Sequence, residues 1–510
     1  MPNLVKWLAA SLVLTVMIVP LTTVAATPGE VQEVISGEIS LVFNDTNYTV
    51  KTVTVDGQTI NYRSYEKIFY VSNPVNTNCQ YLNVYVPESA VNSQTAPIFF
   101  PNGISGYVSA VPIVPATIAS IKYVVNSADP VPVTLAKGPA NIVSVALAKG
   151  YVVVTAGARG SNSMVKDLYT GKAPAAIVDL KAGVRYLRYN DAVMPGSAEK
   201  IISDGTSAGG AISTLLGASG NDALYEPYLV ALGAASKKDD VFATICFAPI
   251  LDLDHADMAY EWMYNRVNNN TDASGKSLYG FTDEQKAISA KLKALYPTYL
   301  NSLGLKSVYD GSHLNDANFE NYVKTFIIAS AQKALDKGVD VSTKSWLTVS
   351  NKKVTDINFN AYLSYVGRQK MMKDPPAFDW LGDKATKPPR NAGSRENKLF
   401  GTATQDISIF TDFAAEQLGT TLSQEVKDRV YLMNAMNFIS KSGSDSAPNW
   451  YIRHGSMDGG TAFSVPVNLY TKLINAGKNV DFGISWEMPH SGDYDLEELF
   501  AWIDRICSSR

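Results

Sequence analysis

A single serine stands between two glycines in residues 201–212, IISDGTSAGGAI. The apolar start of this stretch predicts a strand, and its end predicts a helix. Glycines beside a serine permit the sharp strand-to-helix turn called a nucleophile elbow, which exposes the serine oxygen above the sheet. The first N–H groups of such a helix, beginning with Ala208, face any oxyanion formed at Ser207. The pattern predicts a nucleophilic serine, although G-x-S-x-G also arises by chance in a chain with 35 glycines.

A carboxylate and an imidazole follow Ser207 in the chain order that a serine hydrolase of this kind requires. Asp458 comes after the apolar run 450–454, and His490 comes after the run 480–486. The four histidines of the chain are His255, His313, His454 and His490. His490 fits the position of the general base because it follows the last predicted strand. His454, four residues before Asp458, is the alternative base and otherwise a structural histidine.

Short apolar runs alternate with amphipathic stretches on both sides of Ser207. The sequence predicts buried strands at 96–100, 151–157 and 241–251, and helices at 140–150 and 173–189. This alternation favours an α/β protein with a mostly parallel sheet and helices on both faces. The loop after 96–100 contains Gly103 and Ile104, and either N–H is a candidate second donor to the oxyanion. A plain turn is the alternative interpretation of that loop.

The strand pattern is interrupted once, by a long, polar and helix-rich stretch. We expect residues 27–257 to form the first part of the core, with N-terminal β-hairpins around an Asp56-Gly57 turn. Residues 258–448 are the predicted insertion, and 449–510 complete the core. An insertion between late strands lies over their carboxyl ends, where α/β proteins bind ligands. The predicted architecture is an α/β-hydrolase fold with a large, mainly helical inserted cap.

The N-terminus has the features of a secretory signal. Lys6 precedes an apolar run at 7–21, and small residues end at Ala26, so residues 1–26 are the predicted signal peptide. The expected location is secreted or in the cell envelope, with no membrane contact after cleavage; an uncleaved anchor is the alternative, but the run is short and contains Pro20. A net charge of -4 offers no basic surface to a nucleic acid, so the expected partner is a small molecule. No pattern indicates an oligomeric state.

The sequence gives no strong signal for a metal or a cofactor. Three cysteines, Cys79, Cys246 and Cys507, lie far apart, lack the spacing of a zinc site and allow at most one disulfide. Three carboxylates follow the predicted strand 241–251, at Asp252, Asp254 and Asp257. They could hold a divalent cation, but the glycine-spaced loop of such a site is missing, and hydrogen-bonded carboxylates are the simpler interpretation. We therefore expect neither a metal nor a cofactor.

Four motifs together resemble the bacterial tannases, secreted esterases that hydrolyse galloyl esters. They are GTSAGG at 205–210, APILDLDHAD at 248–257, RHGSMD at 453–458 and HSGDYD at 490–495. The resemblance extends from about Cys79 to the C-terminus and includes the interval between the last two motifs. It implies an α/β-hydrolase esterase with Ser207 as nucleophile, Asp458 as acid and His490 as base.

The resemblance also implies a galloyl pocket formed by a lysine and a glutamate of the cap and by a second aspartate, two residues after the triad acid. Glu396 fits the glutamate, and Lys373 is our choice for the lysine, with Lys384 and Lys387 as alternatives. Gly460 stands where the second aspartate is expected. The missing carboxylate removes an acceptor for phenolic hydroxyls, worth about 1.5–3 kcal/mol per hydrogen bond to a charged group. The resemblance therefore implies the fold and the ester hydrolysis, whereas the missing carboxylate leaves other aromatic esters open as substrates.

The expected function is that of a secreted serine esterase that hydrolyses carboxylic esters of galloyl-like or other phenolic acids through an acyl-enzyme. The first alternative is a feruloyl or general carboxylesterase. A serine peptidase on the same fold would need a propeller or a site for a peptide N-terminus, and the N-terminal region shows no propeller-like repeat. A non-catalytic binding protein typically lacks a triad member, whereas this chain has all three.

Overall fold

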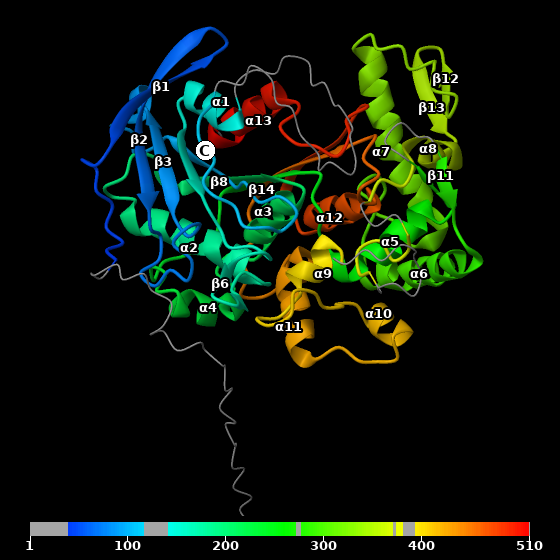
Figure 1. Ribbon diagram of the computed structural model, residues 1–510. Coiled ribbons are helices and arrows are strands. Elements are labelled where there is room, and N and C mark those ends of the chain that lie inside the picture. The colour runs from blue at the N-terminus through cyan, green and yellow to red at the C-terminus, as the bar shows by residue number, and fades with distance from the viewer. Residues whose placement is uncertain (1–38, 117–140, 272–276, 371–373, 381–392, 509–510) are drawn as a thin grey trace, which may run out of the picture. The chain divides into compact units, whose positions relative to one another are not determined.

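A nine-stranded sheet forms the centre of the fold in the computed structural model, which describes residues 39–116, 141–271, 277–370, 374–380 and 393–508 (Figure 1). The strand order across the sheet is β1-β2-β3-β5-β4-β8-β9-β14-β15. The strands are β1 (Thr49–Val55), β2 (Gln58–Ile68), β3 (Leu82–Pro87), β4 (Pro97–Pro101), β5 (Val152–Ala156), β8 (Ser197–Thr206), β9 (Ala243–Phe247), β14 (Asn449–Gly455) and β15 (Asn479–Ser485).

The six strands from β5 to β15 in this order are parallel, whereas β1, β2 and β3 are antiparallel. The predicted N-terminal hairpin is present, since β1 and β2 pair across Asp56 and Gly57. Both turn residues have positive φ, 48° and 80°, as a type I′ hairpin turn requires. The mostly parallel α/β sheet is therefore confirmed.

Helices cover both faces of the sheet. Neighbouring residues of a strand point to opposite faces, and both faces carry apolar side chains that pack against helices. Phe99 and Ile202 belong to the same apolar cluster as α1 (Ile142–Ala148) and α13 (Leu496–Ser508). Phe100 and Ile201 belong to the cluster that contains α2 (Ala175–Asn190), α3 (Ala208–Ala218) and α12 (Ser464–Asn475). The chain between β5 and β9 adds the short β6 (Met164–Val165), β7 (Leu168–Tyr169) and α4 (Glu226–Ala231).

The stretch between β9 and β14 is mainly helical, as the sequence predicts. Its helices are α5 (Leu253–Tyr264), α6 (Asp283–Ser302), α7 (Asp316–Asp336), α8 (Phe359–Val366), α9 (Arg395–Leu399), α10 (Asp412–Gln417) and α11 (Gln424–Met433). Two small hairpins join them: β10 (Asn269–Thr271) with β11 (Ser277–Gly280), and β12 (Leu347–Ser350) with β13 (Lys353–Ile357). The cap boundary expected after residue 257 falls inside α5. None of the described helices combines the length and apolar character needed to cross a membrane.

Candidate active site

Ser207 lies at the junction of β8 and α3, where the sequence predicts a nucleophile elbow. Its backbone has φ 61° and ψ −121°, a strained conformation for a non-glycine residue. Gly205 and Gly209, on either side of Ser207, are required because other backbone atoms approach them too closely for a side chain. A Cβ on Gly205 would lie 2.3 Å from the carbonyl oxygen of Gly209, and one on Gly209 would lie 2.7 Å from that of Ile104. The G-x-S-x-G pattern therefore reflects the packing of this turn.

Ser207, His490 and Asp458 lie in one line of hydrogen bonds. Asp458 Oδ2 is 2.7 Å from His490 Nδ1, and His490 Nε2 is 2.8 Å from Ser207 Oγ. An ionised carboxylate only accepts, so Nδ1 carries the proton and Nε2 is left to accept from the serine hydroxyl. This arrangement suits removal of the Ser207 proton by His490.

His490 and Asp458 each stabilise the charged form of the other, which shifts the pKa of both groups. Burial alone would lower the pKa of His490, but the negative charge of Asp458 and the hydrogen bond to it raise the pKa above the ordinary histidine value. Burial alone would raise the pKa of Asp458, but the charge and hydrogen bond of His490 hold it below its usual value. Asp458 Oδ1 accepts a second hydrogen bond, from the N–H of Gly460 at 2.8 Å. Asp458 is therefore ionised when His490 accepts a proton.

Two loops at the carboxyl ends of β14 and β15 carry Asp458 and His490, and backbone bonds hold these loops together. The N–H of Met457 donates to the carbonyl of Met488 at 3.0 Å, and the N–H of Glu487 donates to Ser456 Oγ at 2.7 Å. A Cβ on Gly455 would lie only 2.1 Å from the Met488 carbonyl oxygen, so the loops touch backbone to backbone. The pairing of parallel strands β14 and β15 thus fixes the separation of Asp458 and His490.

Solved structures that resemble this chain are tannases. A tannase from Fusobacterium nucleatum is 40% identical, with 92% of this chain and 100% of that chain covered and a TM-score of 0.80. The native tannin acyl hydrolase from Lactobacillus plantarum is 39% identical, with 92% and 99% covered and a TM-score of 0.80. A tannin acyl hydrolase in complex with ethyl gallate is 38% identical over 92% and 99%, with a TM-score of 0.79.

The chain belongs to the tannase family. Residues 135–300 also match the family BD-FAE, and no curated protein matches the chain. Membership confirms the resemblance and the α/β-hydrolase fold, and it makes the protein an ester hydrolase. The alternatives of a serine peptidase or a non-catalytic binding protein receive no support from these relatives.

In this tannase-family protein, the N–H groups predicted to bind the oxyanion are those of Ala208 and of either Gly103 or Ile104. Ala208 is fully buried as the first residue of α3, with its N–H at the helix N-terminus. In the β4 loop, the N–H of Ile104 already donates to Asn102 Oδ1 at 3.2 Å. Of Gly103 and Ile104, Gly103 is therefore the better candidate.

The predicted pocket residue Glu396 is buried and paired with a lysine. Its Oε1 is 2.6 Å from Lys370 Nζ, while its Oε2 has no hydrogen-bond partner within the described chain. The predicted Lys373, Lys384 and Lys387 lie outside the described residues, and the lysine that contacts Glu396 in the described chain is Lys370, which the sequence did not single out. Lys370 also lies close enough to His490 for its charge to lower the pKa of that histidine. These contacts bring Glu396 and Lys370 to the vicinity of the triad.

Gly460 faces the triad. A Cβ placed on it would lie 3.1 Å from Asp458 Oδ1 and 3.7 Å from His490 Nδ1. Its φ is not positive, so a side chain is compatible with the backbone. The position at which the resemblance implies a second aspartate lies beside Asp458 and His490, and it carries no side chain here.

His454, the alternative base, is buried behind Asp458. Its Nδ1 is 3.7 Å from Asp458 Oδ2, and neither ring nitrogen has a hydrogen-bond partner among the described residues. Burial lowers the pKa of His454. The ring nitrogen that accepts the hydrogen bond of the Ser207 hydroxyl belongs to His490 instead.

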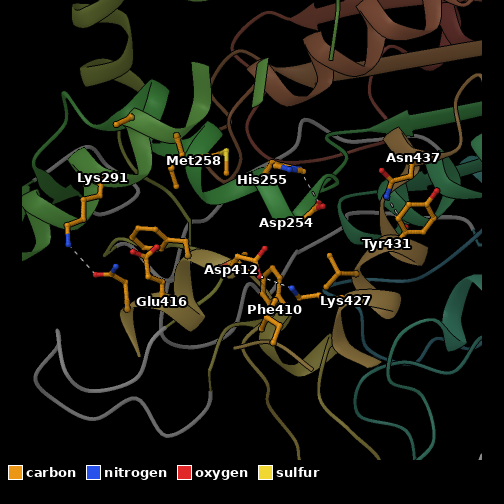
Figure 2. Close-up of a pocket in the computed structure, with 17 residues that line it drawn as sticks. Asp254, His255, Met258, Lys291, Phe410, Asp412, Glu416, Lys427, Tyr431 and Asn437 are labelled. Carbon is orange, nitrogen blue, oxygen red and sulfur yellow. Dashed lines mark hydrogen bonds and ion pairs between the residues drawn. The ribbon is translucent and has the colours of Figure 1, made fainter. Parts of the chain in front are cut away.

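Asp254 and His255 line a separate cavity of about 730 Å³ (Figure 2). Polar atoms of Asp252 lie within 4.8 Å of both. His255 Nδ1 is 2.8 Å from Asp252 Oδ1, and although burial opposes it, the charge of Asp252 raises the pKa of His255 to about 10. A protonated imidazole is a poor metal ligand. Asp257 instead accepts hydrogen bonds from the N–H groups of Ala377, Phe378 and Asp379, at 2.6–2.8 Å. None of the three triad residues lines this cavity in the described chain.

Proposed function

We propose that the protein is a serine esterase that hydrolyses esters of phenolic acids. The observation that carries the proposal is the line of hydrogen bonds from Asp458 through His490 to Ser207, at 2.7 and 2.8 Å, on a strained elbow. His490 takes the proton of Ser207 as Oγ attacks the ester carbonyl. The N–H groups of Ala208 and Gly103 stabilise the oxyanion. His490 then protonates the leaving alcohol, and water hydrolyses the acyl-enzyme by the same steps.

The proposed acyl group is a hydroxylated benzoyl group. Relatives of this chain are solved as tannin acyl hydrolases in complex with ethyl gallate and with 3,4-dihydroxybenzoate. The buried Glu396 supports a similar ligand here, because Oε2 is an acceptor with no partner in the described chain and suits a phenolic hydroxyl. Lys370, bonded to Oε1, places a positive charge beside that carboxylate and offers a donor to a second oxygen.

A less hydroxylated acyl group is the second candidate. Gly460 offers no carboxylate to a third hydroxyl, and residues 135–300 match the BD-FAE family, which is feruloyl esterase-like. A panel of methyl gallate, methyl ferulate and phenyl acetate separates the two candidates by their kcat/KM ratios. The variant Gly460→Asp should raise the ratio of methyl gallate over methyl benzoate; an unchanged ratio would argue against a galloyl-type pocket at this position.

The test of the reaction is Ser207→Ala with wild-type protein as reference. We expect hydrolysis to fall by at least about 1,000-fold, since triad residues act as a unit. The wild type should also lose activity in proportion to covalent labelling of Ser207 by a fluorophosphonate. Hydrolysis within about tenfold of wild type in Ser207→Ala would contradict the assignment of the nucleophile.

We also propose that the protein acts outside the cytoplasm after removal of residues 1–26. The sequence pattern of Lys6, the apolar run and Ala26 supports this location, and these residues lie outside the described part of the chain. N-terminal sequencing of protein recovered from a secreting host should begin at Thr27. A start at Met1 would contradict cleavage.

A further inference from the structure

Asn102 lies immediately after β4, and its side chain bridges the β4 loop and the nucleophile elbow. The amide Nδ2 donates to the carbonyl of Asp204 at 2.9 Å, to that of Gly209 at 3.1 Å and to Ser213 Oγ at 3.1 Å. Its Oδ1 accepts from the N–H of Ile104 at 3.2 Å. The residue is 7% exposed. One buried amide therefore contacts both segments that carry the proposed oxyanion donors.

The glycines of the elbow leave the space that this amide fills. A Cβ on Gly205 would lie 2.5 Å from Asn102 Nδ2, and a Cβ on Gly209 would lie 2.7 Å from Asn102 Oδ1. Any larger residue at either position would push the amide away. The two glycines that flank Ser207 thus serve the approach of Asn102 as well as the turn itself.

We propose that Asn102 is a positioning residue that sets the distance between the two oxyanion donors. Its Oδ1 holds the Ile104 N–H and so orients the peptide groups around Gly103. Its Nδ2 holds the Gly209 carbonyl and so fixes the first turn of α3, which begins with Ala208. This inference rests on the proposed serine esterase function. Since preorganised donors act on charge that develops only in the transition state, a shift of either donor lowers kcat more than it weakens substrate binding.

The variant Asn102→Asp keeps the shape of the side chain and the acceptor for Ile104, but it loses both N–H donors and faces two carbonyl oxygens with a carboxylate. We expect kcat per active site to fall about 100-fold, the loss typical of one displaced oxyanion donor, with KM changed by less than about threefold. The smaller Asn102→Ala should behave similarly. The control Ser213→Ala removes one partner of the amide and leaves both oxyanion segments bonded, so its kcat should stay within about twofold of wild type.

The measurement is hydrolysis of methyl gallate and phenyl acetate, with active sites counted by complete fluorophosphonate labelling. Phenylboronic acid, which forms a tetrahedral adduct with serine, should lose affinity in parallel with kcat, while the acid limb of the kcat/KM profile stays in place. Unchanged kcat per labelled site, or loss of the fold in both Asn102 variants, would overturn the inference and leave a structural role. Failure of wild-type protein to label would instead refute the serine esterase function.

Discussion

Replacing Asp458 by asparagine should move the proton of His490 from one ring nitrogen to the other. The N–H of Gly460 donates to Asp458 Oδ1 at 2.8 Å, so in Asp458→Asn the oxygen of the new amide would take that position. The NH₂ group would then occupy the place of Oδ2, 2.7 Å from His490 Nδ1. A donor there requires Nδ1 to accept, and the neutral ring must carry its proton on Nε2, facing Ser207.

The cost of that exchange is large because the base then has no lone pair toward the serine. A triad asparagine of this kind lowers kcat by about 10⁴-fold, equivalent to about 5.5 kcal/mol. The pKa of His490 should change as well. Asp458 supplies both influences that raise this pKa, while burial and the charge of Lys370 lower it. Without Asp458 the pKa of His490 falls below its ordinary value.

The assay is kcat/KM for phenyl acetate from pH 4 to pH 9. Loss of activity on acidification reports protonation of His490, so its midpoint should move to lower pH in Asp458→Asn while the plateau drops. The matched control is Asp495→Asn, whose carboxylate bonds Ser485 Oγ at 2.7 Å and none of the triad atoms. A midpoint that rises or stays fixed, or a plateau lowered by less than about tenfold, would refute this account of Asp458.

Three further predictions concern stability. Glu261 and Arg368 form a fully buried ion pair, so Glu261→Gln should lower the free energy of unfolding in urea by about 3–5 kcal/mol; a loss below about 1 kcal/mol would contradict the role of the pair. Burial raises the pKa of Asp257 to about 7, despite opposing N–H donors, so the free energy of unfolding should fall as pH rises from about 4 to 7, and Asp257→Asn should flatten that slope. All three cysteines are free thiols in the structure, so dithiothreitol should leave the Tm unchanged.

The strand-to-loop pattern around the triad could be predicted because its signals are local. Ser207, Asp458 and His490 each follow an apolar strand within a few residues, and parallel strands bring their carboxyl ends to one edge. The order of β8, β14 and β15 is typical of the fold, so chain order was enough to select His490 over His454. Geometry agrees with that selection, since His490 Nε2 is the ring nitrogen 2.8 Å from Ser207.

The pairing of Lys370 with Glu396 could not be predicted because it depends on the path of the chain between distant elements. Lys370 and Lys373 are three residues apart, and composition does not distinguish them. Lys370 is directed toward Glu396 because Gly367, with φ 75°, ends α8 and because the N–H of Gln369 then bonds the carbonyl of Gly459 at 3.0 Å. The hydrogen bond from the Ile104 N–H to Asn102 could not be predicted from the sequence either, because a side chain makes that bond and the strand and helix pattern does not indicate it.

The helical stretch between β9 and β14 contacts the loop that carries Asp458. Tyr260 of α5 donates to the carbonyl of Gly459 at 2.8 Å, and Tyr362 of α8 donates to that of Ser456 at 2.7 Å, so cap tyrosines hold the loop of Asp458 from both ends. Lys370, also from the cap, lowers the pKa of His490. Because these bonds hold the backbone on both sides of Asp458, and the charge of Lys370 acts on His490, changes in the cap should alter kcat and its pH dependence together with KM. A cap that only shaped the pocket would alter specificity alone.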